Sequence, residues 1–373
     1  MIAITTTTIF PLDFLSAYAD SLLAAGREGD VIIYVAGDRK SPAGCEGQAA
    51  DCRARGVDAR FLTLDDQAEV LRPYPELAAI VPENSDNRRN AAFVAALRDG
   101  ADVVISIDDD NFCLPGDDFV GGHLAVGTTV THAEAAGESG WFNLCSLLES
   151  EPAPELLYPR GFPYARRGPG CDRLGPATTG TVGVNVGLWL LDPDTDAIGR
   201  LSARPVTTAW TGETVLLGTG VRSPINTQNT ALSRAAMGAY YYVRMGAQLR
   251  GLRLDRFGDI LSGYFLQVCA EAVGDRVRIG GPIVEHRRNQ HDLLVDLYHE
   301  LAGVMMLEDL AGFFSTVRLP GDSYLSAYRA LSHELERFAE AQEGFVWTEE
   351  TKQYVRHMAG WMRIWADVVA DIG

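Results

Sequence analysis

The sequence predicts an α/β fold, with a mostly parallel, Rossmann-type sheet flanked by helices and a helical extension at the C-terminus. Strand-like and helix-like segments alternate from residue 1 to residue 110, an order typical of a parallel sheet covered by helices on both faces. The segment Asp30–Ala36 is a continuous apolar run between two glycines, as in a strand buried on both faces. After His291, apolar residues recur at helical spacing to the end of the chain.

The N-terminal part supplies the clearest elements. The strands that we expect there are Met1–Thr6, Asp30–Ala36, Asp58–Leu64 and Asp102–Ile107. The helices that we expect between them are Leu12–Ala25 and Arg88–Asp99. The first strand is short and rich in β-branched residues, which favour extended backbone. The first helix has apolar residues at helical spacing, and Gly100 directly follows the second helix as a terminating residue.

The central part is less regular, because glycine and proline become frequent between residues 115 and 224. Long loops in a domain of this size usually shape a substrate site. The strand-like pieces within this region are Trp141–Leu144 and Gly183–Leu191. Beyond it we expect the helices Ala231–Met245 and Gly258–Val273 and a last strand, Val277–His286.

The C-terminal part is expected to be helical, with apolar residues at i, i+3 and i+4. The expected helices are Leu293–Met306, Ser323–Gln342 and Thr348–Ile372. We therefore divide the chain into a main domain, residues 1–290, and a helical region, residues 291–373. The helical region either packs on the main domain or is used for oligomerisation, and we expect a homo-oligomer.

Composition excludes several classes of protein. The chain has 373 residues, 47% of them hydrophobic and 22% charged, which is the balance of a globular protein with a large core. It has 32 Lys and Arg against 50 Asp and Glu, a net charge of −18, so we expect neither a nucleic acid nor a membrane surface as a partner. No apolar run is long enough to span a membrane, and the N-terminus lacks a signal-peptide pattern, so we expect a cytoplasmic protein. The high Ala, Gly and Arg content with few Lys is typical of a high-GC bacterial source.

An acidic triplet, Asp108, Asp109 and Asp110, directly follows a predicted buried strand. Ligands bind beyond the carboxyl ends of strands in such sheets, so this triplet, Thr5–Thr8 and Gly37–Lys40 are expected to border one crevice. Three adjacent carboxylates repel one another unless a cation lies among them, and Mg²⁺ or Mn²⁺ prefers oxygen ligands. Alternate residues of an extended chain point the same way, so Asp108 and Asp110 can share one cation. A solvated acidic turn or a helix N-cap is the alternative.

Other polar residues each have two interpretations. Arg88 and Arg89 begin a predicted helix, where they either bind phosphate or offset the acidic surface. His286 ends the last predicted strand and either completes a cation's ligands or is structural. Asp259 is either a site carboxylate or the N-cap of its helix. The arginines of the segment 160–167 mark an anion site or a surface loop.

Several segments, in order along the chain, resemble the reversibly glycosylated polypeptide family of plants, which includes UDP-arabinopyranose mutases. The segment 8–15 (TIFPLDFL) resembles the family's T-I-R-N-L-D-F-L, and 105–110 (ISIDDD) resembles its I-D-D-D. The segment 160–164 (RGFPY) resembles R-G-Y-P-F, and Arg167 falls on the second arginine of that motif. The segment 187–197 (GLWLLDPDTDA) resembles G-L-W-L-N-I-P-D-Y-D-A, and 255–264 (DRFGDILSGY) resembles G-R-Y-D-D-M-W-A-G-W. His286 falls on the family's I-W-H.

The resemblance implies that residues 1–290 form a GT-A-like catalytic domain that binds a nucleotide sugar with a divalent cation, Mn²⁺ or Mg²⁺. It implies that Arg160 is the residue to which the family reversibly attaches the sugar. It places Trp189 and Asn229 on the sugar or acceptor side. The chain departs from the family at residues 227–229 (TQN for G-M-N), at Gly258 (for the first Asp of a pair) and at residues 287–289 (RRN for S-K-A).

Taken together, these features lead us to expect a metal-dependent, retaining glycosyltransferase that moves a sugar from a UDP-sugar to a small acceptor, because the departures cluster on the acceptor side. A UDP-sugar mutase that glycosylates itself on Arg160 is the first alternative, and a non-catalytic scaffold is the second. The residues expected to bind the nucleotide are Thr7, Thr8, Asp38, Arg88, Arg89 and Asp109. The residues expected to bind the metal are Asp108, Asp110 and His286, and those expected to be catalytic are Arg160, Asp259 and Arg167.

Overall fold

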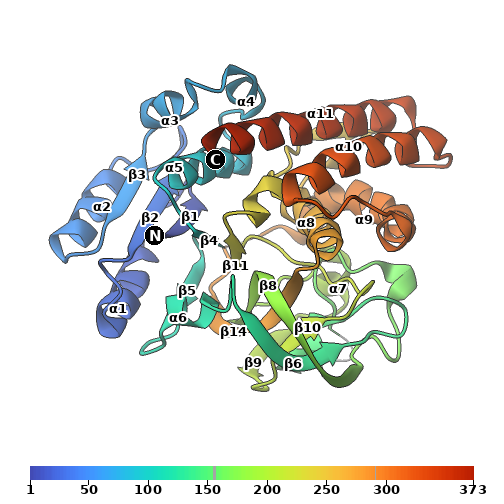
Figure 1. Cartoon of the computed structure of the whole chain (residues 1–373), viewed down its shortest axis with the longest axis horizontal. Coiled ribbons are helices and arrows are strands. Elements are labelled where there is room, and N and C mark those ends of the chain that lie inside the picture. The colour runs from blue at the N-terminus through green and yellow to red at the C-terminus, as the bar shows by residue number, and fades with distance from the viewer. Residues whose placement is uncertain (154–156, 290) are drawn as a thin grey trace.

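A 12-stranded sheet crosses the molecule and carries most of its core (Figure 1). The structure is a computed structural model, and it describes residues 1–153, 157–289 and 291–373. The strands of the sheet are β1 (Ile2–Thr7), β2 (Val31–Ala36), β3 (Ala59–Leu62), β4 (Val103–Ile107), β5 (Asn111–Cys113), β6 (Thr129–Ala135), β7 (Leu148–Glu151), β8 (Leu174–Leu191), β9 (Val206–Trp210), β10 (Val215–Leu217), β11 (Asn229–Ser233) and β14 (Arg276–His286). They are ordered β3-β2-β1-β4-β11-β8-β6-β10-β14-β5, with β7 and β9 paired beside β8. A separate hairpin joins β12 (Ala247–Leu249) and β13 (Leu252–Leu254).

The first four strands of this order, β3, β2, β1 and β4, are all parallel. Ile4 of β1 lies between Ile33 of β2 and Ile105 of β4, so apolar residues run through the middle of this half. The helices beside it are α1 (Leu15–Ala25), α2 (Cys45–Ala54), α3 (Leu64–Leu71), α4 (Pro75–Ile80) and α5 (Arg89–Arg98). The predicted α/β class is confirmed, and each strand expected before residue 110 is present.

The other half of the sheet mixes strand directions. β11 runs antiparallel to both β4 and β8, whereas β14 runs parallel to β8. Two short helices, α6 (Phe119–His123) and α7 (Ala197–Ser202), belong to this half. Since β11 follows an antiparallel course, the parallel arrangement expected from the sequence ends at β4.

Two predicted elements were wrong. The segment Ala231–Met245 is not a helix: its start belongs to β11, and a short 3-10 turn and irregular backbone follow. Its apolar residues are buried on all sides, and under such burial the spacing of a helix and of a strand cannot be told apart. The segment Trp141–Leu144 is not a strand, because only Trp141 pairs, in an isolated bridge to Arg222. The side chain of Asn143 then accepts a hydrogen bond from the amide of Cys145 and starts a 3-10 turn.

Four long helices form the C-terminal side of the molecule: α8 (Gly258–Val273), α9 (Leu293–Thr316), α10 (Tyr324–Ala341) and α11 (Glu349–Ile372). The bounds of α8 are those predicted. α10 and α11 lie side by side, and α10 packs against α8 (Figure 1). The C-terminal helices therefore lie against the main domain, and residue 290, at the predicted boundary, is outside the described residues.

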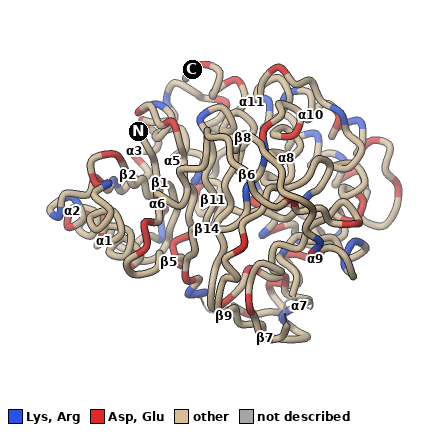
Figure 2. Tube along the Cα trace, turned by 60° about the horizontal axis from the view of Figure 1, so that its bottom comes forward, with Lys and Arg blue, Asp and Glu red and all other residues tan. Residues whose placement is uncertain are grey.

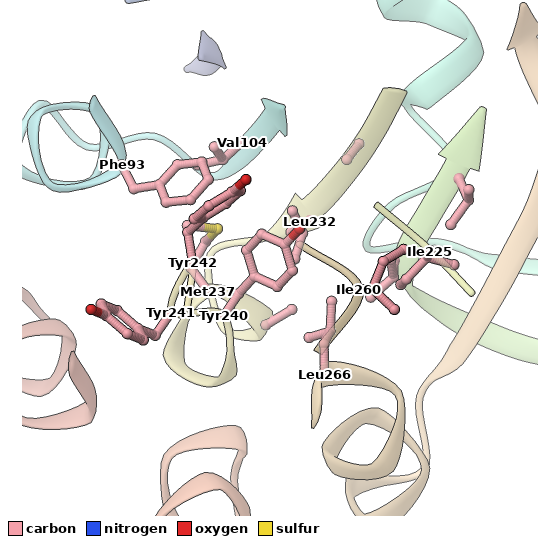
Figure 3. Close-up of a cluster of buried hydrophobic side chains, with 14 of the residues drawn as sticks. Phe93, Val104, Ile225, Leu232, Met237, Tyr240, Tyr241, Tyr242, Ile260 and Leu266 are labelled. Atoms are coloured by element: carbon pink, nitrogen blue, oxygen red, sulfur yellow. The ribbon is translucent and has the colours of Figure 1, made fainter. Parts of the chain in front are cut away.

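The interface between these helices and the sheet is aromatic. Figure 3 shows Phe93 of α5, Val104 of β4 and Leu232 of β11 in one cluster with Tyr240, whereas the ring of Tyr241 points away from that cluster. Acidic residues occur in many parts of the trace, as expected for a net charge of −18 (Figure 2). Within the described residues, no helix combines the length and the hydropathy that crossing a bilayer requires.

Trp365 of α11 ties the last helix to this aromatic core. Its indole Nε1 donates a hydrogen bond of 2.8 Å to the carbonyl oxygen of Met237, and its ring lies 6.4 Å from Phe93 and 6.2 Å from Tyr241. We expect Trp365→Ala to lower the free energy of unfolding by about 3–5 kcal/mol, as for other large-to-small changes in a core. Denaturant unfolding followed by circular dichroism measures this loss. Trp361→Ala, on a partly exposed position of the same helix, is the control and should cost less; equal losses would contradict the packing role of Trp365.

Candidate functional site

A pocket of about 400 Å³ opens at the carboxyl ends of the parallel strands. Thr7 and Thr8 line it at the end of β1, and Asp38 lines it after β2. The acidic triplet 108–110 lines it after β4. These three segments meet because the carboxyl ends of neighbouring parallel strands share one edge of the sheet.

The nucleotide-binding residues expected at this edge are held by hydrogen bonds to neighbouring side chains and backbone amides. The hydroxyl of Thr8 donates to the carboxylate of Asp109, and it also accepts a hydrogen bond of 2.9 Å from the amide of Phe10. The carboxylate of Asp38 accepts a hydrogen bond of 3.1 Å from the amide of Ser85. This wall of the pocket is therefore a set of short loops, each fixed by a side chain that also faces the cavity.

Arg89 and Asp108 form an ion pair in the pocket wall. The Nη2 of Arg89 lies 2.6 Å from Oδ1 of Asp108, and its Nη1 donates a hydrogen bond of 2.9 Å to the hydroxyl of Ser106. Burial raises the pKa of Asp108 to about 6, although the charge of Arg89 opposes that rise. Asp108 thus has a cationic partner of its own.

Asp110 and His286 face each other across two paired strands. His286 of β14 pairs with Asn111 of β5, the residue next to Asp110, so the strand register brings the two side chains together. Oδ2 of Asp110 lies 3.4 Å from Nε2 of His286. On the other side of the ring, Nδ1 of His286 donates a hydrogen bond of 2.5 Å to the carbonyl oxygen of Asp192. A carbonyl oxygen only accepts, so Nδ1 is the ring nitrogen that carries a proton. Burial acts to raise the pKa of Asp110, but the neighbouring His286 holds it below its ordinary value.

Arg160 is buried in the pocket wall between two carboxylates. Its Nε and Nη2 lie 2.9 and 3.0 Å from the carboxylate oxygens of Asp194. Its Nη1 and Nη2 lie 3.2 and 2.8 Å from those of Asp259. Its Nη1 also donates to the carbonyl oxygen of Arg256. A guanidinium has five N–H donors, and these contacts occupy all of them.

Asp259 stands in the first turn of α8, and the N-cap interpretation of this residue was wrong. The N-cap position is Phe257, which makes no side-chain capping bond, and Asp259 is already helical. Its carboxylate instead faces Arg160 and the pocket.

Two arginines expected in the site lie outside the pocket lining. Arg88 turns into the interior, where its Nε donates a hydrogen bond of 2.7 Å to Gln67, whose amide nitrogen in turn donates to the carbonyl oxygens of Gly37 and Leu62. Arg167 pairs with Asp196 at 2.8 Å, and its guanidinium lies 3.6 Å from the centre of the Tyr164 ring. Arg88 and Arg167 therefore hold loops in place, and we correct the expectation that they contact substrate.

Two residues expected on the sugar or acceptor side are also structural. The amide nitrogen of Asn229 donates to the carbonyl oxygens of Leu188 and Pro282, and its oxygen lies 2.9 Å from Nε2 of His123. Trp189 is a buried residue of β8. Neither lines the pocket, because alternate residues of a strand point to opposite sides; Gln228, directly before Asn229, does line it.

Sequence reasoning missed several residues of the pocket. Asp194 has a local signal, since it stands in the segment 193–197 that matches a family motif. Tyr242 has none, because it was placed in a helix that does not form. The further pocket residues that were not predicted are Ile9, Phe10, Asn84, Ser85, Asp86, Gln228, Arg256, Arg288 and His291.

Comparison with known proteins places this site in a family context. "Probable UDP-arabinopyranose mutase 2" of Solanum tuberosum is 29% identical over 180 residues, which cover 47% of this chain and 45% of that protein. "UDP-arabinopyranose mutase 1" of Arabidopsis thaliana is 29% identical over 162 residues, covering 43% of this chain and 42% of that protein. The chain thus matches less than half of the length of these relatives.

Solved structures give more distant likenesses. TarS of S. aureus in complex with UDP-GlcNAc has a TM-score of 0.44 at 10% identity, covering 99% of this chain and 90% of that chain. Glucosyl-3-phosphoglycerate synthase from Mycobacterium tuberculosis has a TM-score of 0.40 at 13% identity, covering 83% and 79%. Both TM-scores lie below 0.5.

The family model described as "Reversibly glycosylated polypeptide" matches residues 87–370. This range holds the acidic triplet, Arg160, Asp194, Asp259 and His286, and it is well over half of the chain. The chain therefore belongs to the reversibly glycosylated polypeptide family.

Proposed function

We propose that the chain binds a UDP-sugar in this pocket and transfers the sugar reversibly to Arg160, as a UDP-sugar mutase of the UDP-arabinopyranose type. The observation that carries the proposal is the position of Arg160, which lines the pocket in contact with the carboxylates of Asp194 and Asp259. Membership of the reversibly glycosylated polypeptide family and the printed names of the plant relatives support it.

In this proposal the pocket has a nucleotide end and a sugar end. Thr7, Thr8 and Asp38, at the strand ends, hold the nucleoside, and Asp109 contributes through its bond with Thr8. Arg89 assists the diphosphate, because a guanidinium matches phosphate oxygens. The sugar then lies between the diphosphate and Arg160.

The residues present fit a divalent cation. The pocket lining contains seven aspartates against five Lys and Arg residues, which leaves an excess of negative charge. Among the described residues, no group of three or more His, Cys, Asp or Glu is arranged as a complete metal cluster. Asp110 and His286 nevertheless face each other at 3.4 Å, and Mg²⁺ is commonly held by one or two carboxylates and completed by substrate phosphates. Asp108 could join them only by loosening its pair with Arg89.

Asp110 and His286 would hold Mn²⁺ or Mg²⁺, which would neutralise negative charge on the leaving diphosphate. Because Nδ1 of His286 donates to the carbonyl oxygen of Asp192, Nε2 is the ring nitrogen that would bind the cation. Arg89, which pairs with Asp108 of the same acidic triplet, would act on the same diphosphate.

Arg160 must lose a proton to accept a sugar, because a guanidinium is protonated at any ordinary pH. Oδ2 of Asp259, 2.8 Å from Nη2, is in position to take it. The N–C1 bond forms as the bond between C1 and the phosphate oxygen breaks, the diphosphate keeps that electron pair, and Asp259 holds the proton until the reverse step. The sugar–arginine adduct keeps its positive charge, so its ion pair with Asp194 is preserved.

Transfer to a small external acceptor is the second candidate. Gln228 and Arg288, at positions where the chain departs from the family motifs, both line the pocket and could bind such a molecule. Arg160 would then bind the acceptor or the diphosphate without being modified. A scaffold without catalysis would bind no UDP-sugar, and a shift of the melting temperature with UDP and Mn²⁺ distinguishes it from both enzymes.

The first test concerns Arg160. Incubation with a panel of UDP-sugars and Mn²⁺ should add the mass of one glycosyl unit to the wild-type protein, and peptide mapping should place it on Arg160. Arg160→Lys and Arg160→Ala should both lose the adduct, because an ammonium lacks the guanidinium's fork of donors. The measurement is intact-protein mass spectrometry combined with analysis of the released sugars.

The two enzymatic candidates predict different results. If the sugar goes to an external acceptor, the wild-type protein stays unmodified, and Arg160→Lys keeps partial transfer with a raised acceptor KM. An adduct on any other residue would overturn both roles of Arg160.

The second test concerns Asp110. We expect Asp110→Asn to reduce metal-stimulated turnover of UDP-sugar by about 10²-fold, because a cation loses a charged ligand. The melting temperature should change little, since the carboxylate lies at the pocket wall. Asp117→Asn, an exposed aspartate a few residues on, is the matched control and should keep wild-type turnover. Normal turnover of Asp110→Asn would remove the metal from the proposal.

The third test concerns assembly. We expect at least a dimer that forms through the C-terminal helices, where Leu294 and Val295 of α9 are exposed apolar side chains. Light scattering at micromolar concentration measures the mass, and a monomer would contradict this expectation without affecting the proposed reaction. The cytoplasmic location stays a prediction.

A further inference from the structure

The two carboxylates that hold Arg160 contact different edges of its guanidinium. Asp194 pairs with Nε and Nη2, the edge nearest the side-chain stem. Asp259 pairs with Nη1 and Nη2, the edge at the tip. Because the edges are all engaged, the group can meet a sugar only over its flat face. The orientation of that face then depends on the two carboxylates.

Asp194 is held in place by further hydrogen bonds besides its ion pair with Arg160. Its Oδ2 accepts a hydrogen bond of 2.7 Å from the side-chain amide of Asn226. Its carbonyl oxygen accepts a hydrogen bond of 2.7 Å from the backbone amide of Arg160, so the two residues are joined through both main chain and side chain. Its side chain is only 4% exposed. The charge of Arg160 keeps the pKa of Asp194 below its ordinary range despite its burial, so this carboxylate stays ionised.

We propose that Asp194, braced by Asn226, is a positioning residue that sets the plane of the Arg160 guanidinium for sugar transfer. The inference rests on the proposed function. Both carboxylates make two contacts, but at different edges of the guanidinium. The contact of Asp259 at the tip leaves the side-chain stem free to turn, and the contact of Asp194 at the Nε edge removes that freedom. Asp259 takes the proton, and Asp194 forms and breaks no bond.

If Asp194 has this role, its removal should affect the rate of sugar transfer and the binding of UDP differently. Asp194 contacts Arg160 and Asn226, and the nucleotide end of the pocket is built from other segments. Removing the charge of Asp194 should therefore slow transfer to Arg160 while leaving the binding of UDP in place. Water would then compete better for the activated sugar, and more free sugar would be released per adduct formed.

Asp196 provides a matched control in the same segment. It is also a buried aspartate, and it pairs with an arginine, Arg167, at 2.8 Å. The difference is that Arg167 lies outside the pocket lining. Asp196→Asn thus breaks an ion pair of the same kind two residues away, and it also keeps a side chain suited to the N-cap of α7.

The experiment compares wild type, Asp194→Asn and Asp196→Asn with a UDP-sugar that labels the wild-type protein. The initial rate of the mass increment on Arg160 at saturating UDP-sugar, the amount of free sugar released and the Kd for UDP are measured for each. Asp194→Asn should lower the rate about 10²-fold, as expected for a misplaced reacting group, and raise the ratio of free sugar to adduct. Its Kd for UDP should stay within about twofold of wild type, since ground-state binding of the nucleotide is unchanged. Asp196→Asn should label at the wild-type rate.

Asn226→Ala keeps the test decisive if Asp194→Asn does not fold. This variant removes the hydrogen bond to Asp194, together with two hydrogen bonds to Gln228, and leaves the ion pair with Arg160. Labelling should therefore fall by about tenfold. Labelling of Asp194→Asn or Asn226→Ala at the wild-type rate, or a loss of UDP binding in parallel with labelling, would overturn the positioning role alone. A wild-type protein that binds UDP but is never labelled would overturn the proposed transfer to Arg160, and this inference with it.

Discussion

Arg160 is 6% exposed, and a guanidinium buried to that degree is tolerated in a protein only when opposite charges surround it. The carboxylates that do so come from distant parts of the chain: Asp194 follows β8, and Asp259 lies in the first turn of α8. Because both carboxylates must contact the buried guanidinium, the loop that carries Arg160 lies against the end of β8 and the start of α8. The wall of the pocket around Arg160 is the result of that requirement.

The opposite wall depends on strand pairing. The parallel half of the sheet places three loop segments at one edge, and these segments line the pocket. The register of β5 against β14 adds His286 beside Asp110, although the two are far apart in sequence. The pocket therefore lies where the parallel half meets the mixed half, and each half contributes one part of the candidate chemistry.

Much of the site could be predicted because strand ends can be found in a sequence. An apolar run followed by Asp108–Asp110 locates a carboxyl end, and a parallel sheet brings such ends together. The direction in which a side chain points beyond those ends could not be predicted as well. Asn229 is the first residue of β11 and Gln228 directly precedes it, and of the two only Gln228 lines the pocket. The prediction of a helix at Ala231–Met245 was wrong for a related reason. This segment is buried on all sides, so its apolar and polar residues do not alternate with the period that identifies a helix.

Arg88 and Arg89 are adjacent and identical in chemistry, yet one supports the scaffold and the other faces the pocket. Arg88 holds Gln67, which joins the backbone of Gly37 to that of Leu62, so it supports from behind the loop on which Asp38 stands. Selection for nucleotide binding would act on both residues: on Arg88 because it holds the loop of Asp38 in position, and on Arg89 because it faces the pocket. If both arginines were invariant in this family, two different constraints would preserve them. Invariance alone would then not show which arginine contacts the ligand.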